Sequence, residues 1–329
     1  MRSRRLKAGA AVFAAICVMS PVAAADRATP AASVRPAPAV RPPDRGTGAA
    51  AGIAGVPAPP SPPSSIPDTI DWPAAAGSAV AYAGAAAVTV HGSRRPAPIA
   101  SVAKVMTAYV VLTDHPLAEG SAGPTITVTA AQAALYEADS ADGQSVIRVS
   151  AGERLTERQA LQELLLRSAN NVAALLAEWD AGSVPAFLAR MNAAAARLGL
   201  ADTRYADPAG LSRDTVSTAA DQVRLGLEAL GLRAFAELVA LPSAHVPVAG
   251  TIENSDTMLG VDGIVGLKTG YTKAAGGTMI VAARVTVRGR ALLIVGALLG
   301  VPGDSGTVLG NTLDAGDGLV CAAVARLGG

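Results

Sequence analysis

Three strand-like segments near the C-terminal end of the chain constrain its fold most strongly. They are rich in β-branched and other apolar residues and span 263–271, 278–287 and 290–299. Only Arg288 and Gly289 lie between the last two segments, a spacing that predicts an antiparallel hairpin. The chain is therefore expected to contain an antiparallel sheet.

The region before these strands shows the apolar spacing of helices. Segment 100–112 has this spacing, and 129–230 is expected to be mostly helical. Thr156 and Gln159 fit a capping box before a helix at 160–179. Further helices are predicted at 185–198, 217–230 and 306–326, and a strand or hairpin at 78–90. This order predicts an α+β fold in which an antiparallel sheet is flanked by helices and a helical subdomain is inserted.

The first 25 residues have the pattern of a secretory signal peptide. Arg2, Arg4, Arg5 and Lys7 precede an uncharged run, and small residues at 23–25 offer a cleavage site. The apolar run holds about 13 residues, whereas a membrane span needs roughly 20. We therefore expect export to the periplasm or cell wall, with an uncleaved N-terminal membrane tether as the alternative.

The next segment, 26–67, is rich in Ala, Pro, Gly and Ser and has no aromatic residue. Such a composition buries too little apolar surface to offset the entropy of ordering. It is predicted to be a disordered, Pro-stiffened linker. The globular domain is then expected at 68–329.

Charge and composition exclude several classes of function. The net charge of +1 argues against a nucleic-acid partner, which usually needs a basic surface. Cys17 and Cys321 form no CxxC motif, and removal of residues 1–25 leaves Cys321 without a partner. The three histidines form no HExxH motif. We therefore expect neither a metal nor a cofactor, and the sequence assigns no role to Cys321.

Lysine is scarce, which makes each lysine informative. The chain has only Lys7, Lys104, Lys268 and Lys273, against 23 arginines. An amine can lose its proton, whereas a guanidinium essentially never does. Lys104 follows Ser101 by three residues, so on a helix their Cβ atoms lie roughly 5–6 Å apart on one face. A neutral Lys104 could then take the proton of a nucleophilic serine.

Two further short motifs can complete such a site. Ser168-Ala169-Asn170 offers a hydroxyl that can relay a proton and an amide that can hold a peptide. Lys268-Thr269-Gly270 ends a predicted strand, where a lysine and a hydroxyl can hold a carboxylate. The glycine would let a substrate backbone approach the strand closely.

The three motifs in this order resemble the signature of penicillin-binding proteins and class A β-lactamases. The chain is similar to the low-molecular-mass penicillin-binding proteins, the serine-type D-alanyl-D-alanine carboxypeptidases, from about Ser78 to Gly300. Similar stretches are 101–108, 165–174, 203–211, 217–219 and 266–276. The resemblance implies a penicillin-binding, β-lactamase-like fold.

The resemblance also implies catalytic roles. Ser101 would attack the carbonyl between two terminal D-alanines, and Lys104 would be the general base. Ser168 would pass a proton to the leaving amine. Asn170 would bind the substrate peptide and steady Lys104.

The third motif would bind the substrate's C-terminal end. Lys268 and Thr269 would hold the terminal carboxylate, and Gly270 would belong to the same binding strand. The backbone N–H groups of Ser101 and Tyr271 would form the oxyanion hole.

The implied substrate is the stem peptide of peptidoglycan, and β-lactams would be covalent inhibitors. A DD-endopeptidase, a β-lactamase of the same fold and a non-catalytic wall-binding relative are the alternatives. The β-lactamase alternative is weakened because segment 198–211 contains Asp202 and Asp207 but no glutamate to activate water.

A few residues depart from the family or fit no role in it. Ala169 stands where glycine is common, and Ser255-Asp256 follows Asn254 where a second asparagine is expected. Residues 303–306 are expected to form a polar loop. Lys273 is predicted to be a surface charge. Trp72 and Trp179 are predicted to pack, and His91, His115 and His245 to lie at the surface.

Overall fold

The computed structural model describes residues 63–328. The predicted signal peptide and residues 26–62 of the predicted linker lie outside the described residues. Ile66, within the predicted linker, is only 1% exposed and packs in an apolar cluster with Val80 and Tyr82. The packed region therefore begins a few residues before the predicted boundary at 68.

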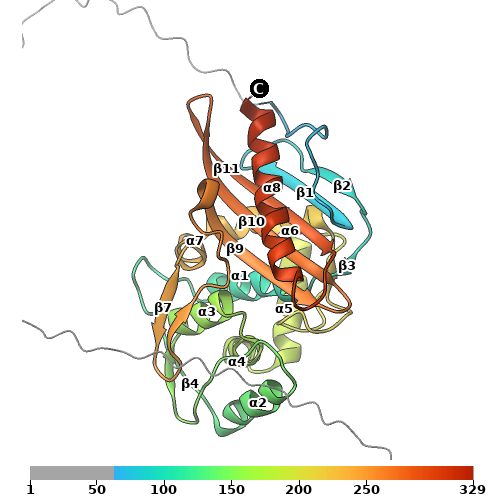
Figure 1. Cartoon of the computed structure of the whole chain (residues 1–329). Helices are drawn as coiled ribbons and strands as arrows, with labels where there is room; N and C mark the ends of the chain where they lie inside the picture. Colours follow the sequence, from blue (N-terminus) through green and yellow to red (C-terminus); the bar gives the residue numbers. More distant parts are fainter. Residues whose placement is uncertain (1–62, 329) are drawn as a thin grey trace, which may run out of the picture. The chain divides into compact units, whose positions relative to one another are not determined.

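The central sheet has five strands in the order β2-β1-β11-β10-β9, and every neighbouring pair is antiparallel (Figure 1). These strands are β1 (Gly77–Tyr82), β2 (Thr89–Gly92), β9 (Ile264–Thr272), β10 (Gly276–Val287) and β11 (Arg290–Val301). The predicted segments 263–271, 278–287 and 290–299 are therefore strands, and segment 78–90 is a hairpin. The predicted α+β class is confirmed.

A tight turn sets the register of the β10–β11 hairpin. Arg288 and Gly289 both have positive φ, at 50° and 77°. Positive φ at both central residues is the geometry of a type I′ turn, whose twist matches that of the strands. Val287 therefore pairs with Arg290, as the predicted hairpin requires.

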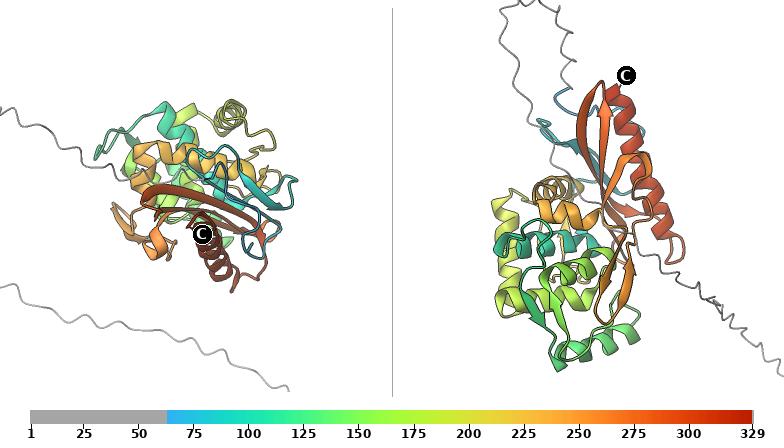
Figure 2. Two further views of the ribbon diagram at one scale, coloured as in Figure 1. Left: turned by 90° about the horizontal axis from the view of Figure 1, so that it is seen from above. Right: turned by 90° about the vertical axis from the view of Figure 1, so that its left-hand side faces the viewer.

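Helices cover both faces of the sheet (Figure 2). Helix α8 (Val308–Gly328) packs against β10 and β11, while α6 (Ala219–Gly231) packs against β1 and β11 from the other side. A Cβ at Gly226 of α6 would lie 2.9 Å from Val295 Cγ1, so a glycine lets this helix approach the sheet.

The remaining helices form the subdomain next to β9. They are the short 3₁₀ helix η1 (Ala100–Ala103) and helices α1 (Lys104–Asp114), α2 (Ala130–Ala141), α3 (Glu157–Leu166), α4 (Asn170–Ala181), α5 (Val184–Arg197) and α7 (Arg233–Val239). Short antiparallel pairs join them: β3 (Ala97–Pro98) with β6 (Val216–Ser217), β4 (Thr125–Thr127) with β5 (Arg154–Thr156), and β7 (Ser243–Val246) with β8 (Gly250–Glu253). A second 3₁₀ helix, η2 (Val261–Gly263), leads into β9.

One predicted helix is wrong. The segment expected as a single helix at 160–179 is two helices, α3 and α4, separated at residues 167–169. Ser168 has φ of +59°, a left-handed conformation that cannot continue an α-helix. The apolar spacing did not reveal the break because the residues on both sides of it are buried. The predicted capping box of Thr156 and Gln159 is present at the start of α3.

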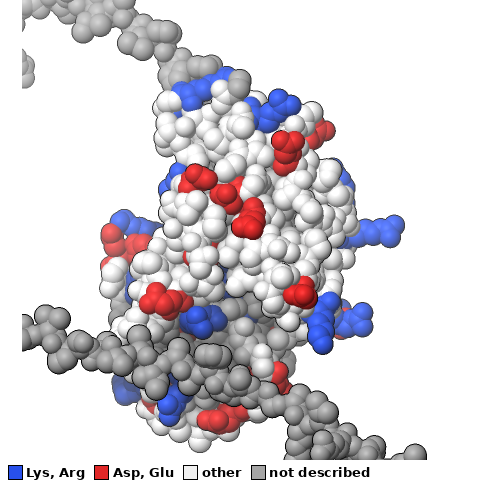
Figure 3. Space-filling view, in the orientation of Figure 1, with Lys and Arg blue, Asp and Glu red and all other residues white. Residues whose placement is uncertain are grey.

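Other sequence features lie as predicted. Trp72 and Trp179 pack against apolar clusters, and residues 303–306 form a loop before α8. His91 and His245 are exposed. Among the described residues, no single helix is long and apolar enough to cross a membrane; α4 and α5, bent by 86°, pass that test only as a pair. Basic and acidic side chains are interspersed on the face shown in Figure 3.

Candidate active site

The candidate nucleophile Ser101 lies in η1, directly before α1. Ala100, the residue before it, has φ of +46°, so the chain turns sharply into this helix. Thr278 of β10 donates a hydrogen bond from Oγ1 to the carbonyl of Ile99 at 2.9 Å. The sheet therefore fixes where the segment that carries Ser101 begins.

Lys104 lies one turn further, at the start of α1, and is fully buried. Its Nζ lies 2.9 Å from Ser101 Oγ, 2.7 Å from Asn170 Oδ1 and 3.0 Å from the carbonyl oxygen of Ala209. A neutral amine has two N–H groups and one lone pair. The two carbonyl oxygens can accept the two N–H groups, which leaves the lone pair for the hydroxyl proton of Ser101.

The electrostatic environment favours this neutral amine. Burial, followed by the nearby Lys268 cation, lowers the pKa of Lys104 well below its ordinary value. The carboxylate of Asp207 opposes the shift. Desolvation disfavours a charged amine, as does a neighbouring like charge. The surroundings thus favour the neutral form of the Lys104 amine, which is the form that can accept a proton.

Helix η1 and the start of α1, which carry Ser101 and Lys104, form the first wall of the site, and the break between α3 and α4 forms the second wall. Its left-handed residue is Ser168, which lines the same cleft as Ser101. Asn170 starts α4, and its Nδ2 donates to Gln144 Oε1 at 3.1 Å while its Oδ1 faces Lys104. The side-chain amide of Asn170 therefore has a fixed orientation, with the oxygen toward the lysine.

A loop that sequence reasoning treated only as a connecting segment holds this arrangement together. Asp207 Oδ1 accepts backbone N–H bonds from residues 209, 210 and 211, and its Oδ2 accepts from Ser212 N and Thr215 Oγ1. Thr107 of α1 donates to the carbonyl of Pro208 at 2.6 Å. These bonds place the carbonyl of Ala209 against Lys104.

Gly210 in this loop has no room for a side chain. It has φ of +81°, and a Cβ there would lie 1.8 Å from the carbonyl oxygen of Ala100. The loop therefore packs directly on the backbone turn that precedes Ser101. The Asp-Pro-Ala-Gly sequence is the signal that could have revealed this contact.

Strand β9 forms the third wall and carries residues 268–271. A Cβ at Gly270 would lie 2.6 Å from Ser101 N and 2.7 Å from Thr278 Oγ1. The glycine was predicted to let a substrate backbone approach the strand. The structure shows that the backbone of Ser101 itself makes the close approach.

Lys268 lies behind the cleft rather than in it. It is only 2% exposed, and its Nζ donates to the carbonyl of Thr269 at 2.9 Å. Burial lowers its pKa to about 8, against the opposing effect of the Asp256 carboxylate. Asp256, noted in the sequence only as a departure, is thus a buried charge near Lys268.

The three walls enclose a cleft of about 720 Å³. The predicted site residues that line it are Ser101, Ser168, Asn170, Thr269, Gly270 and Tyr271. The two buried lysines lie beneath this surface, and Lys104 reaches the cleft through its contact with Ser101 Oγ. The sequence-predicted residues are therefore brought together, in an arrangement capable of acyl transfer through a serine.

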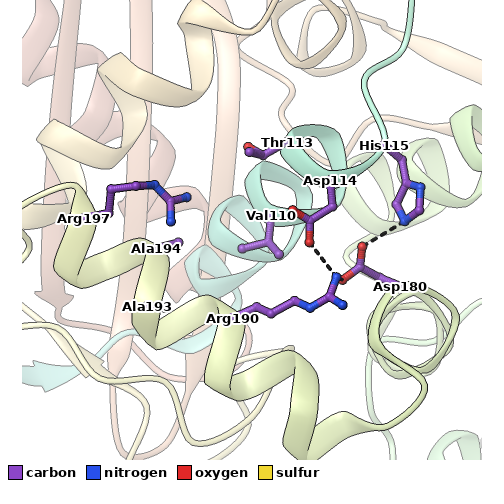
Figure 4. A pocket seen from close by; sticks show the side chains of 9 residues that line it. All are labelled: Val110, Thr113, Asp114, His115, Asp180, Arg190, Ala193, Ala194 and Arg197. Atoms are coloured by element: carbon purple, nitrogen blue, oxygen red, sulfur yellow. Dashed lines mark hydrogen bonds and ion pairs between the residues drawn. The ribbon is translucent and has the colours of Figure 1, made fainter.

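A second cavity, of about 580 Å³, lies at the far end of α1 (Figure 4). Arg190 of α5 pairs with Asp114 at 2.7 Å and Asp180 at 2.9 Å, which ties α5 to the ends of α1 and α4. His115 was expected at the surface but is only partly exposed, because its ring packs on Trp179 and its Nε2 lies 3.1 Å from Asp180. No lysine is among the described residues that line this cavity.

Comparison with known proteins decides the family. The sequence model of the D-alanyl-D-alanine carboxypeptidase peptidases matches residues 70–297, which include all three walls. The chain belongs to this family. Its resemblance to the low-molecular-mass penicillin-binding proteins is thereby confirmed.

Individual curated relatives match the chain over shorter stretches than the family model does. The chain is 37% identical over 179 residues to the D-alanyl-D-alanine carboxypeptidase DacB2 of Mycobacterium tuberculosis, covering 51% of this chain and 60% of the relative. It is 39% identical over 137 residues to a D-alanyl-D-alanine endopeptidase of Pseudomonas aeruginosa, covering 40% and 41%. The chain thus matches about 60% or less of the length of these curated relatives.

Solved structures confirm the predicted penicillin-binding-protein fold. A D-alanyl-D-alanine carboxypeptidase from Mycobacterium tuberculosis is 30% identical, with a TM-score of 0.65, and the match covers 79% of this chain and 95% of that one. The Streptomyces K15 DD-transpeptidase has a TM-score of 0.66 over 78% of this chain and 99% of its own. At 24% identity, the second likeness concerns the fold alone.

Proposed function

We propose that this family member is a serine D-alanyl-D-alanine carboxypeptidase that acts on peptidoglycan stem peptides. The observation that carries the proposal is the position of the buried Lys104 amine. Its Nζ lies 2.9 Å from Ser101 Oγ while two carbonyl oxygens hold its N–H groups. This geometry directs the lone pair of the amine at the proton of the nucleophile.

Acylation follows from this geometry. Ser101 Oγ attacks the carbonyl between the two terminal D-alanines as its proton passes to Lys104. The backbone N–H groups of Ser101 and Tyr271 stabilise the oxyanion. The C–N bond then breaks as the proton held by Lys104 passes through the Ser168 hydroxyl to the departing amine, which leaves Ser168 protonated and returns Lys104 to its neutral form. The products are an ester on Ser101 and free D-alanine.

Deacylation uses the same base. A water molecule attacks the ester, Lys104 takes one of its protons, and Ser101 leaves with a proton restored to its oxygen. Of the described residues that line the cleft, Asp142 is the one carboxylate, and no glutamate is among them. Hydrolysis of a penicilloyl ester is therefore expected to be slow, which favours a penicillin-binding protein over a β-lactamase.

The strand β9 would bind the terminal carboxylate of the substrate. Thr269 lines the cleft, so its hydroxyl can donate to that carboxylate. Lys268 lies directly behind it and supplies positive charge from a buried position, where solvent screens little. The two residues would thus select peptides that end in a free carboxyl group.

The first experiment is labelling with a fluorescent penicillin, followed by a D-alanine release assay. Labelling that maps to Ser101, with slow release of the label, supports the proposal. Ser101→Ala and Lys104→Arg should each abolish labelling and cleavage, because arginine cannot act as a base. Ser305→Ala is the matched control, because Ser305 lines the same cleft. Rapid penicillin hydrolysis would indicate a β-lactamase, and absence of any label a wall-binding protein.

A DD-endopeptidase is the second candidate function, favoured by the 39% identity to the Pseudomonas aeruginosa endopeptidase. Both activities attack a D-alanyl carbonyl and differ in the amine that leaves. Purified cross-linked muropeptides, offered beside a linear pentapeptide, distinguish them. Faster cleavage of the cross-linked substrate would support the endopeptidase.

We also propose export, supported by the basic start, the short apolar run and the small residues at 23–25. The proposed substrate lies outside the cytoplasmic membrane. N-terminal sequencing of the exported protein should give a start near Asp26. A start at Met1 on membrane-bound protein would indicate an uncleaved anchor, and protein confined to the cytoplasm would contradict export.

A further inference from the structure

A series of side-chain hydrogen bonds leads from the end of α2 to the Lys104 amine. Gln144 donates from Nε2 to Asp139 Oδ1 at 3.1 Å, and its Oε1 accepts from Asn170 Nδ2 at 3.1 Å. Asn170 Oδ1 in turn lies 2.7 Å from Lys104 Nζ. Gln144 and Asp139 are both half-buried, and Gln144 lines the cleft. The proposed chemistry uses Asn170 and Lys104 but gives no role to the other two residues.

The carboxylate at one end of this series sets the direction of every bond after it. An ionised carboxylate only accepts hydrogen bonds, so Asp139 must receive the NH₂ group of Gln144. The carbonyl oxygen of Gln144 then faces Asn170, which must donate to it from its own NH₂ group. The carbonyl oxygen of Asn170 is thereby turned toward Lys104.

The direction of the Asn170 amide decides how the lone pair of Lys104 is used. With its oxygen toward the lysine, the amide accepts one N–H group, and the lone pair is left for Ser101. A reversed amide would point its NH₂ group at the same nitrogen. That NH₂ group would then donate to the lone pair, which is the part of the amine that has to take the Ser101 proton.

Backbone contacts beside Gln144 hold the same two segments together without its side chain. The Asn170 N–H donates to the carbonyl of Ser145 at 2.8 Å. The Asn171 side chain accepts from the Ile147 N–H at 3.1 Å and donates to the Ile147 carbonyl at 2.9 Å. A substitution at Gln144 can therefore change the direction of the Asn170 amide while this attachment to the start of α4 remains.

We propose that Gln144 and Asp139 are positioning residues for acylation, because together they hold the Asn170 amide in the direction that leaves the lysine lone pair to the nucleophile. This inference rests on the proposed function and extends it to two residues outside the three sequence motifs. Asp139 orients the amide of Gln144, and Gln144 orients the amide of Asn170.

The test measures the second-order rate constant of penicillin acylation at Ser101 across pH. Gln144→Leu removes the acceptor, so Asn170 can reverse, and the maximal rate constant should fall about tenfold. A reversed amide replaces an acceptor of the Lys104 ammonium group by a donor, which lowers the pKa of Lys104. The acidic limb of the profile should therefore move to lower pH. General loosening of the site would admit water and move that limb to higher pH.

Two more variants test the direction of the bonds. Gln144→Glu places a side chain that only accepts against Asn170, so it should keep the maximal rate constant within about threefold of the wild type. Asp139→Leu should lower that constant about threefold, because Gln144 can then turn its NH₂ group toward Asn170. Combined with Gln144→Glu, Asp139→Leu should cause no further loss, since a carboxylate needs no orientation. Equal losses in both backgrounds would contradict the role of Asp139.

The matched control is Gln132→Leu at the other end of α2. Gln132 donates to Glu178 of α4 at 2.7 Å and does not line the cleft, so its loss should leave the rate constant and the pH profile unchanged. An equal loss in this control would show that α2 acts only as a structural support. That result, unchanged acylation in Gln144→Leu, or a loss without the shift to lower pH would overturn this inference alone. Absence of penicillin labelling in the wild type would overturn the proposed function and this inference with it.

Discussion

Glu163 gives the sharpest test of how burial sets the stability of this protein. It lies in α3 with no exposed surface, and neither carboxyl oxygen has a hydrogen-bond partner among the described residues. Burial, and secondarily the charge of Glu153, raises the pKa of Glu163 from its ordinary 4.5 to about 8. The folded state therefore keeps this carboxyl group protonated up to about pH 8, whereas in the unfolded chain the group ionises near pH 4.5.

The sign and size of the effect follow from that difference. Because the folded pKa is raised, the stability that Glu163 contributes is fully present below pH 4.5 and is lost as pH rises to about 8. At about 1.4 kcal/mol for each pH unit, the loss between pH 5 and pH 9 is about 4 kcal/mol as an upper value. Glu163→Gln cannot ionise, so it should not show this loss.

Denaturant unfolding of the wild type and of Glu163→Gln at pH 5 and pH 9 measures the effect. The two proteins should differ little at pH 5, and the variant should be clearly more stable at pH 9. The matched control is Glu228→Gln, which removes the charge of an exposed glutamate and should give a difference that does not depend on pH. A constant difference between wild type and Glu163→Gln at both pH values would refute the reasoning.

Two further predictions concern the surroundings of Ser101 and Lys104. Since the Lys268 cation helps to lower the pKa of Lys104, Lys268→Gln should raise that pKa. The acidic limb of penicillin acylation, along which the rate rises as Lys104 loses its proton, should then move to higher pH, and an unmoved limb would contradict the coupling. Gly210→Ala should abolish rapid acylation because its Cβ would lie 1.8 Å from the carbonyl oxygen of Ala100. Gly199→Ala, also at positive φ but in open space, should lower stability by about 1 kcal/mol and leave acylation intact, so equal effects of the two variants would argue against the clash.

The short motifs of the candidate site could be predicted because each one consists of residues that are close together in the sequence. Ser101 and Lys104 are three residues apart, so one turn of helix brings them together wherever that helix lies. The strands and the β10–β11 hairpin were predictable for a similar reason, since β-branched runs and a two-residue turn act locally.

The break at Ser168 could not be predicted from the same kind of signal. Apolar periodicity reports which residues are buried, and burial continues from α3 into α4 through the break. A left-handed residue at 168 is stable only because the surrounding structure holds it there. The sequence therefore identified the Ser168-Ala169-Asn170 motif correctly but predicted one continuous helix where the structure has two.

The sequence by itself determined the parts of the site and their local order, and the family to which they belong. Only the tertiary structure decided which groups surround the Lys104 amine: Asn170 lies 66 residues away in sequence, and Ala209 lies 105 residues away. It also decided that Lys268 is buried, with the Asp256 carboxylate opposing the fall in its pKa. Desolvation and charge act through space, so the pKa of a lysine depends on neighbours that are distant in the sequence and cannot be identified from a local sequence pattern.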